Sequence, residues 1–254
     1  MENSFEAGLD ALKQKLLTMA SHAETAVNRA VQALVQRDAD LANRVKEDDR
    51  VIDQFEVEID ELAIQLLTKA PLATNLRLVT VAMKISQDLE RIGDEASKIA
   101  KRARDLCQEP PIKINLDLPR IAGLALDMLK AALDAFVNRD SAAARAIIPR
   151  DKEVDALNRE IVQTLIGHMM KTPEIIGRSL HWIVAAKSLE RIADHAKNIA
   201  EEVVYLQEAQ DIRHSLKNWA RKRNRNRLRN LYWIRRFRNW SNCWQPHAWG
   251  HWLW

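Results

Sequence analysis

The amino-acid sequence predicts an all-α protein built from two similar three-helix bundles in tandem, and three observations support this. The phrase Leu89-Glu-Arg-Ile-Gly-Asp94 returns one hundred positions later as Leu189-Glu-Arg-Ile-Ala-Asp194. This distance indicates a duplicated domain, because solenoid repeats have periods of about 20–50 residues. Apolar residues recur at steps of three and four, as in the seam of long antiparallel helices. The 254 residues include only 6 Gly and 7 Pro, which is few for a β-rich fold with many turns.

Matching breaks divide each copy into three helices. An aspartate that can cap a new helix stands at Asp38 and again at Asp140. A proline that interrupts a helix stands at Pro71 and again at Pro173. The helices are therefore expected at residues 3–36, 39–69, 75–107, 119–138, 141–170 and 174–213.

The same pattern predicts how the chain is divided. The first repeat is expected to span residues 1–107 and the second residues 119–214. Residues 108–118 contain two prolines that break the helical pattern, so they form the expected linker. Residues 215–254 form an atypical tail rich in Arg and Trp.

The tail differs sharply from the body in composition. From Ser215 onward there are 10 Lys and Arg, no Asp or Glu, and 7 of the 8 Trp, which leaves 29 of the 39 basic residues beside all 35 acidic residues in the body. A basic, Trp-rich segment could bind nucleic acid or a membrane surface. The abrupt change favours translation in a shifted reading frame or an incidental extension, with poor order or a short amphipathic helix. The acidic body argues against nucleic-acid binding.

Several classes of protein are disfavoured by the sequence. The lone cysteines Cys107 and Cys243 argue against a disulfide framework and fit a reducing compartment. The sequence contains no run of about 18 uncharged apolar residues, so a membrane-spanning helix is not expected. No secretory signal is visible. The sequence also lacks a glycine-rich phosphate loop, a Cys-x-x-Cys motif and a nucleophilic serine in an elbow context. We therefore expect a protein that is not an enzyme.

Both copies keep pairs of carboxylates four residues apart. If Leu89 lies in the helix seam, Glu90 and Asp94 share a face turned away from it. The middle helix of each copy carries a second such pair, and the two helices should be antiparallel neighbours. Clustered carboxylates suit oxygen-seeking cations such as Mg²⁺, Mn²⁺, Ca²⁺ or iron. The candidate metal ligands are Asp49, Asp53, Glu90 and Asp94 in the first copy and Asp151, Asp155, Glu190 and Asp194 in the second.

Other interpretations of these residues stay open. Charges on an outer helix face are usually only solvated. A metal-dependent phosphate-ester hydrolase could use metals held by carboxylates to activate water, although the counterpart of His195 is Glu95, so the copies share no histidine for proton transfer. The Glu-x-x-His motif of di-iron bundles is absent. Arg91 and Arg191 adjoin the acids and could bind phosphate or a partner's carboxylate, with an outer-face salt bridge as the default.

The segment from Glu190 to Glu201, Glu-Arg-Ile-Ala-Asp-His-Ala-Lys-Asn-Ile-Ala-Glu, resembles the signature of the PhoU proteins, regulators of bacterial phosphate uptake. The first-copy phrase from Glu90 to Asp94 matches it more loosely. The resemblance covers about residues 3–214, whereas family chains usually stop shortly after the segment that corresponds to Asp-Ile-Arg-His.

The resemblance implies a cytoplasmic, non-enzymatic protein with two tandem three-helix bundles. It implies partners: the ATPase of a phosphate ABC transporter and a phosphate-sensing histidine kinase, through which alone the chain would reach the membrane. It implies negative regulation of the phosphate-starvation response. It also implies clusters of iron or zinc, with magnesium or manganese as alternatives, on the eight carboxylates. Long helices with spare apolar positions could in addition pair into a homodimer.

Overall fold

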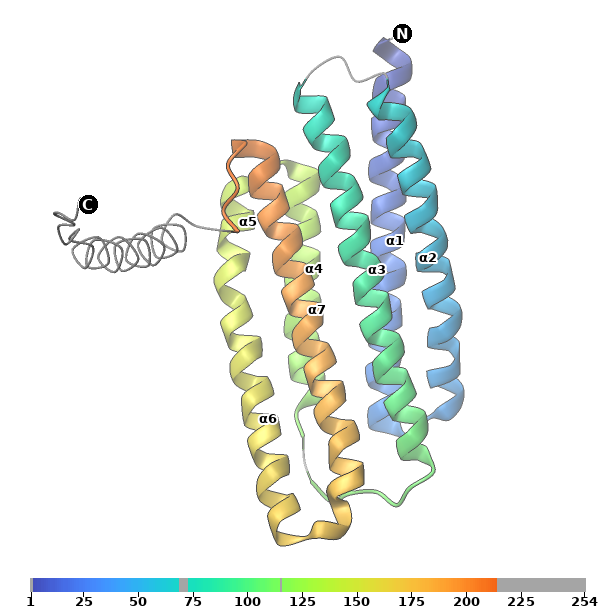
Figure 1. Ribbon diagram of the computed structural model, residues 1–254, viewed down its shortest axis with the longest axis vertical. Helices are drawn as coiled ribbons and strands as arrows, with labels where there is room; N and C mark the ends of the chain where they lie inside the picture. Colours follow the sequence, from blue (N-terminus) through green and yellow to red (C-terminus); the bar gives the residue numbers. More distant parts are fainter. Residues whose placement is uncertain (1, 69–72, 115, 214–254) are drawn as a thin grey trace, which may run out of the picture. The chain divides into compact units, whose positions relative to one another are not determined.

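The structure is a computed structural model that describes residues 2–68, 73–114 and 116–213 (Figure 1). The expectations for the tail lie outside the described residues. Within the described part every regular element is a helix, which confirms the all-α prediction. No described helix is long and apolar enough to cross a membrane.

The first three helices form one bundle in which each helix packs against the other two. They are α1 (Glu2–Gln36), α2 (Ala39–Leu67) and α3 (Ala73–Cys107). Their apolar stripes face inward because apolar residues at three- and four-residue steps fall on one side of a helix. The side chains buried in this core include Leu12, Leu16, Met19, Ile52, Ile59, Ile85, Leu89 and Ile92.

The second bundle repeats this plan with one difference. It contains α4 (Leu118–Asn138), α5 (Ser141–Ile147), α6 (Asp151–Lys171) and α7 (Ile176–Glu208). The single helix expected at 141–170 is therefore interrupted, and a 3-10 turn at Ile148–Arg150 joins α5 to α6. Pro149 lies in that turn, and a proline inside an α-helix lacks the N–H needed for the helical hydrogen bond. A second 3-10 turn, Pro173–Ile175, precedes α7.

The turns after the first helix of each repeat have the same geometry, as the duplication predicts. Arg37 and Arg139 both adopt a left-handed backbone conformation, with φ of 58° and 54°. The next residue is the N-cap in each case. Asp38 accepts hydrogen bonds from the backbone N–H groups of Asp40 and Leu41, and Asp140 accepts one from Ala143.

The two bundles belong to one compact unit, residues 1–210. Helices α3 and α7 pack against each other and join the repeats, and in Figure 1 they run side by side in opposite directions. Their contacts follow that antiparallel order. Lys84 Nζ lies 3.0 Å from Glu202 Oε2 at one end, and Arg191 Nη1 lies 3.2 Å from Glu95 Oε1 further along.

Candidate functional site

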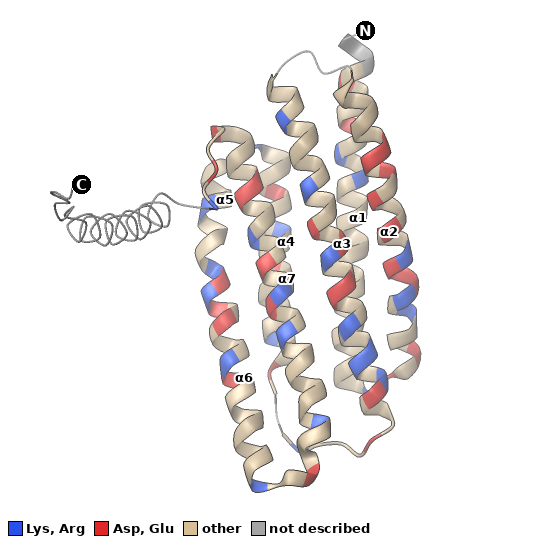
Figure 2. Ribbon diagram, in the orientation of Figure 1, with Lys and Arg blue, Asp and Glu red and all other residues tan. Residues whose placement is uncertain are grey.

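Acidic side chains gather between the second and third helices of each repeat. In Figure 2, Asp and Glu positions lie along α2, α3, α6 and α7, the helices that carry the predicted ligands. In the first repeat, α2 and α3 are packed neighbours. We define the first acidic face as Asp49, Asp53 and Glu56 of α2 with Glu90 and Asp94 of α3.

The carboxylates of the first acidic face repel one another. Partial burial raises the pKa of Asp49, and the negative charges of Asp53 and Asp94 raise it further. Burial likewise raises the pKa of Glu90, with added repulsion from Asp94 and Glu56. These residues come from both helices, so the structure brings the two predicted pairs together.

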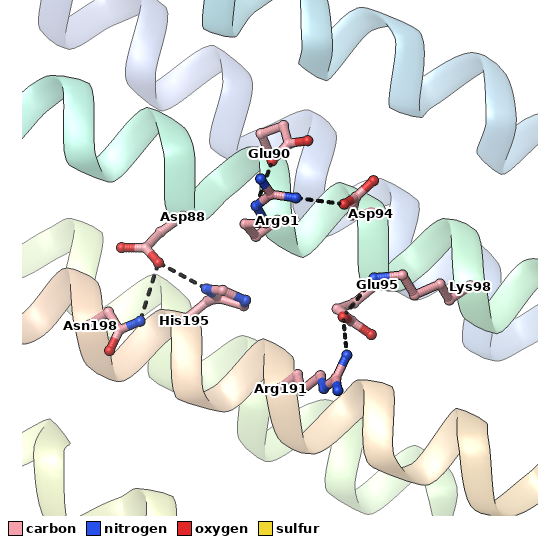
Figure 3. Close-up of polar contacts among 9 residues, drawn as sticks. All are labelled: Asp88, Glu90, Arg91, Asp94, Glu95, Lys98, Arg191, His195 and Asn198. Atoms are coloured by element: carbon pink, nitrogen blue, oxygen red, sulfur yellow. Dashed lines mark hydrogen bonds and ion pairs between the residues drawn. The ribbon is translucent and has the colours of Figure 1, made fainter.

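One guanidinium partly offsets this charge. Arg91 donates a hydrogen bond from Nη1 to Asp94 Oδ2 at 3.2 Å, and its Nε lies 3.3 Å from Glu90 Oε2 (Figure 3). Glu90 Oε2 is buried and accepts no hydrogen bond, so its contact with Arg91 is an ion pair only. One guanidinium leaves most of the negative charge of the five carboxylates in place, so this face keeps the capacity to bind a cation.

The second acidic face occupies the corresponding place between α6 and α7, which are also packed neighbours. We define it as Asp151, Asp155 and Asn158 of α6 with Glu190 and Asp194 of α7. Asn158 donates a hydrogen bond to Glu190 Oε2 at 2.7 Å, which links the two helices directly.

Two ammonium groups contact the second acidic face. Lys197 donates from Nζ to Asp151 Oδ2 at 2.8 Å, and Lys187 is paired with Glu190. Burial lowers the pKa of Lys197, but the hydrogen bond and charge of Asp151 outweigh it, so the pKa is raised overall. The other oxygen of Asp151, Oδ1, is buried without a partner, as is Oδ1 of Asn158.

The carboxylates of the second face also repel one another. Burial raises the pKa of Asp194, and the charges of Asp151 and Glu190 add to this effect. Burial raises the pKa of Asp155 as well, with repulsion from Asp151 and Glu190 and a hydrogen bond to Glu190. All four predicted acids of this repeat therefore interact across α6 and α7.

The donor chemistry of both faces fits oxygen-seeking cations. Mutually repelling carboxylates and buried oxygens without partners are stabilised by a bound positive charge. Among the residues that the structure describes, no three His, Cys, Asp or Glu side chains already converge as a preformed metal site. The predicted metal binding at the eight carboxylates thus stays a prediction, supported by charge and burial rather than by a finished coordination geometry.

Sequence reasoning missed one position in each face. Glu56 and Asn158 are counterparts, 102 residues apart, and each follows its aspartate pair by one further helical turn. Burial raises the pKa of Glu56, and Asp60 and Asp53 repel it. The pair spacing i, i+4 continues to i+7 on the same helix face, so following that face by one further turn in each copy, rather than comparing the copies, would have found both positions.

The two arginines singled out from the sequence have different surroundings. Arg91 serves the first acidic face, whereas Arg191 reaches across to Glu95 of α3 in the other repeat (Figure 3). Lys98 donates to the same oxygen of Glu95 at 2.9 Å. His195, the imidazole nearest the second face, lies 2.8 Å from Asp88 Oδ1, also across the repeats. Arg191 and His195 therefore hold the bundles together, and partner binding by the arginines stays a prediction.

Known proteins share this duplication and fold. The PhoU domain model matches residues 16–103 and 118–203. The chain is 41% identical over 216 residues to a phosphate-specific transport system accessory protein PhoU homolog of Pseudomonas aeruginosa, covering 84% of this chain and 89% of the relative. It is 35% identical over 215 residues to the accessory protein PhoU of Escherichia coli, with the same coverage.

Solved structures agree. A crystal structure of PhoU from Pseudomonas aeruginosa has a TM-score of 0.78 at 41% identity and covers 81% of this chain and 100% of its own. That of the phosphate transport system regulatory protein PhoU from Streptococcus pneumoniae has a TM-score of 0.77 at 29% identity, covering 82% of this chain and 99% of its own. The match through both repeats, the matching fold and the identity to the relatives place the chain in the PhoU domain family.

Proposed function

We propose that this chain is a cytoplasmic regulator of bacterial phosphate uptake that keeps the phosphate-starvation response off while phosphate is plentiful. The observation that carries the proposal is the family match through both repeats, with relatives named as phosphate-specific transport system accessory proteins. The partners we propose are the ATPase of a phosphate ABC transporter and a phosphate-sensing histidine kinase. The chain would act as a homodimer and would reach the membrane only through these proteins.

The proposed mechanism is protein contact rather than catalysis. A bound protein shifts the conformation of its partner only as far as it binds one state more tightly than another. Long helices packed around a continuous core provide a rigid surface for such discrimination. The 3-10 turn at Ile148–Arg150 interrupts the middle helix of the second repeat, whereas the corresponding helix α2 of the first repeat is continuous. The surfaces of the two bundles therefore differ.

We further propose that both acidic faces bind metal ions, iron or zinc in the first instance. A bound cation would neutralise the carboxylates that now repel one another. In the first repeat Asp49 and Asp53 of α2 would hold it together with Glu90 and Asp94 of α3. In the second repeat the ligands would be the corresponding Asp151, Asp155, Glu190 and Asp194. Each site would tie the second helix of its repeat to the third.

A bacterial strain that lacks its own PhoU protein tests the regulatory proposal. A reporter gene under a phosphate-starvation promoter is expected to be active in this strain at high phosphate, and expression of this chain should silence it. The matched control is a chain with core substitution Leu89→Asp, which removes the fold rather than a surface. A reporter that stays equally active with and without the unaltered, soluble chain would reject the proposed function.

A further inference from the structure

The two acidic faces differ most at one pair of counterpart residues, Ser97 and Lys197. In the second repeat the ammonium of Lys197 is bound to Asp151 Oδ2 at 2.8 Å. In the first repeat the counterpart of Lys197 is the uncharged Ser97. The neighbouring Lys98 is hydrogen bonded to Glu95 (Figure 3), and its charge partly offsets the rise that burial causes in the pKa of Asp49, but the described ion pairs include none between Lys98 and a carboxylate of the first face.

The remaining charges increase this difference. Glu56 adds a fifth carboxylate to the first face, whereas its counterpart Asn158 is neutral. Lys187 pairs with Glu190, whereas its counterpart Gln87 has no charge. Against this, the only cation bound to carboxylates of the first face among the described ion pairs is Arg91. The first face is therefore the more negative of the two.

The second face nevertheless keeps oxygens suited to a cation. Asp151 and Asn158 are 7% and 8% exposed, and Oδ1 of each is buried without a hydrogen-bond partner. Lys197 uses only the other oxygen of Asp151. An ammonium has only three N–H donors, fewer than the carboxylate and amide oxygens of this cluster, so it leaves acceptors unused. The second face thus has oxygen ligands for a metal ion, but it already contains the positively charged ammonium of Lys197.

We propose that Lys197 is a built-in cation of the second acidic face that competes with metal for Asp151, so that the first face binds metal before the second. The inference rests on the proposed metal binding and assigns an order to it. A metal ion that binds Asp151 through Oδ1 is repelled by the ammonium on Oδ2, and one that binds through both oxygens has to displace it, so the apparent affinity of the metal is weakened in either case. The corresponding neighbour of Asp49 in the first face is the hydroxyl of Ser97, which carries no charge to oppose a metal ion.

Manganese binding to purified, chelator-treated protein tests this order. Asp53→Asn with Asp94→Asn disables the first face, and Asp155→Asn with Asp194→Asn disables the second. With only the second face active, Lys197→Ser should tighten Mn²⁺ binding by about tenfold or more, since it removes a full charge beside the ligands. With only the first face active, Ser97→Lys should weaken binding by a similar factor.

Equilibrium dialysis with elemental analysis measures the binding, and circular dichroism verifies that each variant is helical. Lys130→Ser on α4 changes the net charge equally at an exposed residue that belongs to neither face, and should leave the Mn²⁺ affinity unchanged. Should a face-disabled variant misfold, Lys197→Ser in the otherwise unaltered chain should still increase the Mn²⁺ bound at a fixed free concentration.

Equal affinity in the Lys197→Ser and Lys130→Ser proteins would overturn the inference, as would the absence of Mn²⁺ binding in every variant. These outcomes are independent of the regulatory proposal, which is read from the reporter strain. Reciprocal affinity changes combined with an unresponsive reporter would leave the inference standing and reject the regulatory function alone.

Discussion

Gly93 of α3 packs closely against α2 beside the first acidic face. A Cβ at this position would lie 2.9 Å from Ile52 Cδ1 and 3.1 Å from Asp49 Oδ1. Ile52 is fully buried, so its side chain has little room to move. The counterpart in the second repeat is Ala193, which is also fully buried. The absence of a side chain at Gly93 therefore lets an acid and an apolar residue of α2 pack against the α3 backbone.

Replacing this glycine with alanine should change the free energy of unfolding in the direction opposite to the usual one for a helix. Alanine in a helix interior is normally more stable than glycine by about 0.5–1 kcal/mol. Gly93→Ala should instead lower the free energy of unfolding, because overpacking a core typically costs about 1–3 kcal/mol. Gly123→Ala on α4, where nothing lies within 4 Å of the added Cβ, is the matched control and should be neutral or stabilising. Urea unfolding measures both, and equal effects would contradict the close packing at Gly93.

The acidic residues predict a pH dependence of stability in the metal-free protein. The pKa values of Asp49 and Asp194 are raised above the ordinary 3.8, chiefly by burial. At pH values between the pKa of each group in the unfolded state and its higher pKa in the folded state, the folded protein binds more protons than the unfolded protein does. The contribution of these groups to stability therefore increases as the pH falls through this range. Carboxylates with lowered pKa values, such as Glu95, act in the opposite direction, so the test is the difference between two proteins. In thermal unfolding at stepped pH from 7 to 4, acidification should favour the parent over an Asp49→Asn, Asp194→Asn protein. The double variant shares every histidine with the parent, so an identical pH profile would contradict the raised pKa values of Asp49 and Asp194.

At the scale of the elements, the repeated turns are stabilised by their capping aspartates. Asp38→Ala and Asp140→Ala should each cost about 0.5–2 kcal/mol, because each removes hydrogen bonds to the first N–H groups of the next helix. Asp134→Ala changes an exposed aspartate within α4 and should have little effect. Denaturant unfolding compares the three proteins. Equal stability of all three would show that these caps contribute nothing.

The helices could largely be predicted from the sequence, because apolar spacing and capping residues act locally. The sequence contains Pro149, which could have indicated a break in the helix expected at residues 141–170. The apolar pattern on both sides of it instead suggested one continuous helix. The acidic faces were predicted from repetition alone, without Glu56 and Asn158, since those positions differ in charge between the copies. The hydrogen bond from Lys197 to Asp151 could not be predicted, because the partner of a lysine depends on the three-dimensional positions of the side chains.

At the scale of the whole molecule, the contacts between repeats could not be predicted from the sequence. They depend on how two finished bundles dock, and no spacing along one helix encodes that. In the structure α3 and α7 pack against each other, and charged pairs link them, including Asp88 with His195 and Glu95 with Arg191. Arg191 was considered for phosphate or partner binding because it adjoins an acidic pair, and His195 for proton transfer. Their position between the bundles gives them a role in holding the two repeats in one unit.

The tail gives a further prediction for the whole chain. The family match ends at residue 203, and the most basic part of the sequence begins after Ser215. A chain that ends at His214 should therefore silence the phosphate-starvation reporter as well as the full chain does. Equal protein levels, verified by immunoblot, are the control. Loss of repression in the shorter chain alone would show that the Arg- and Trp-rich segment takes part in function.

The metal content of the protein as purified from cells tests the central claim, that the two acidic faces are the functional site. Elemental analysis would compare the unaltered chain with a variant carrying Glu90→Ala, Asp94→Ala, Glu190→Ala and Asp194→Ala. Each face loses the two ligands that α3 or α7 contributes, so the account predicts bound iron or zinc in the parent and little in the variant. Equal metal content in two well-folded proteins, or none in the parent, would contradict it.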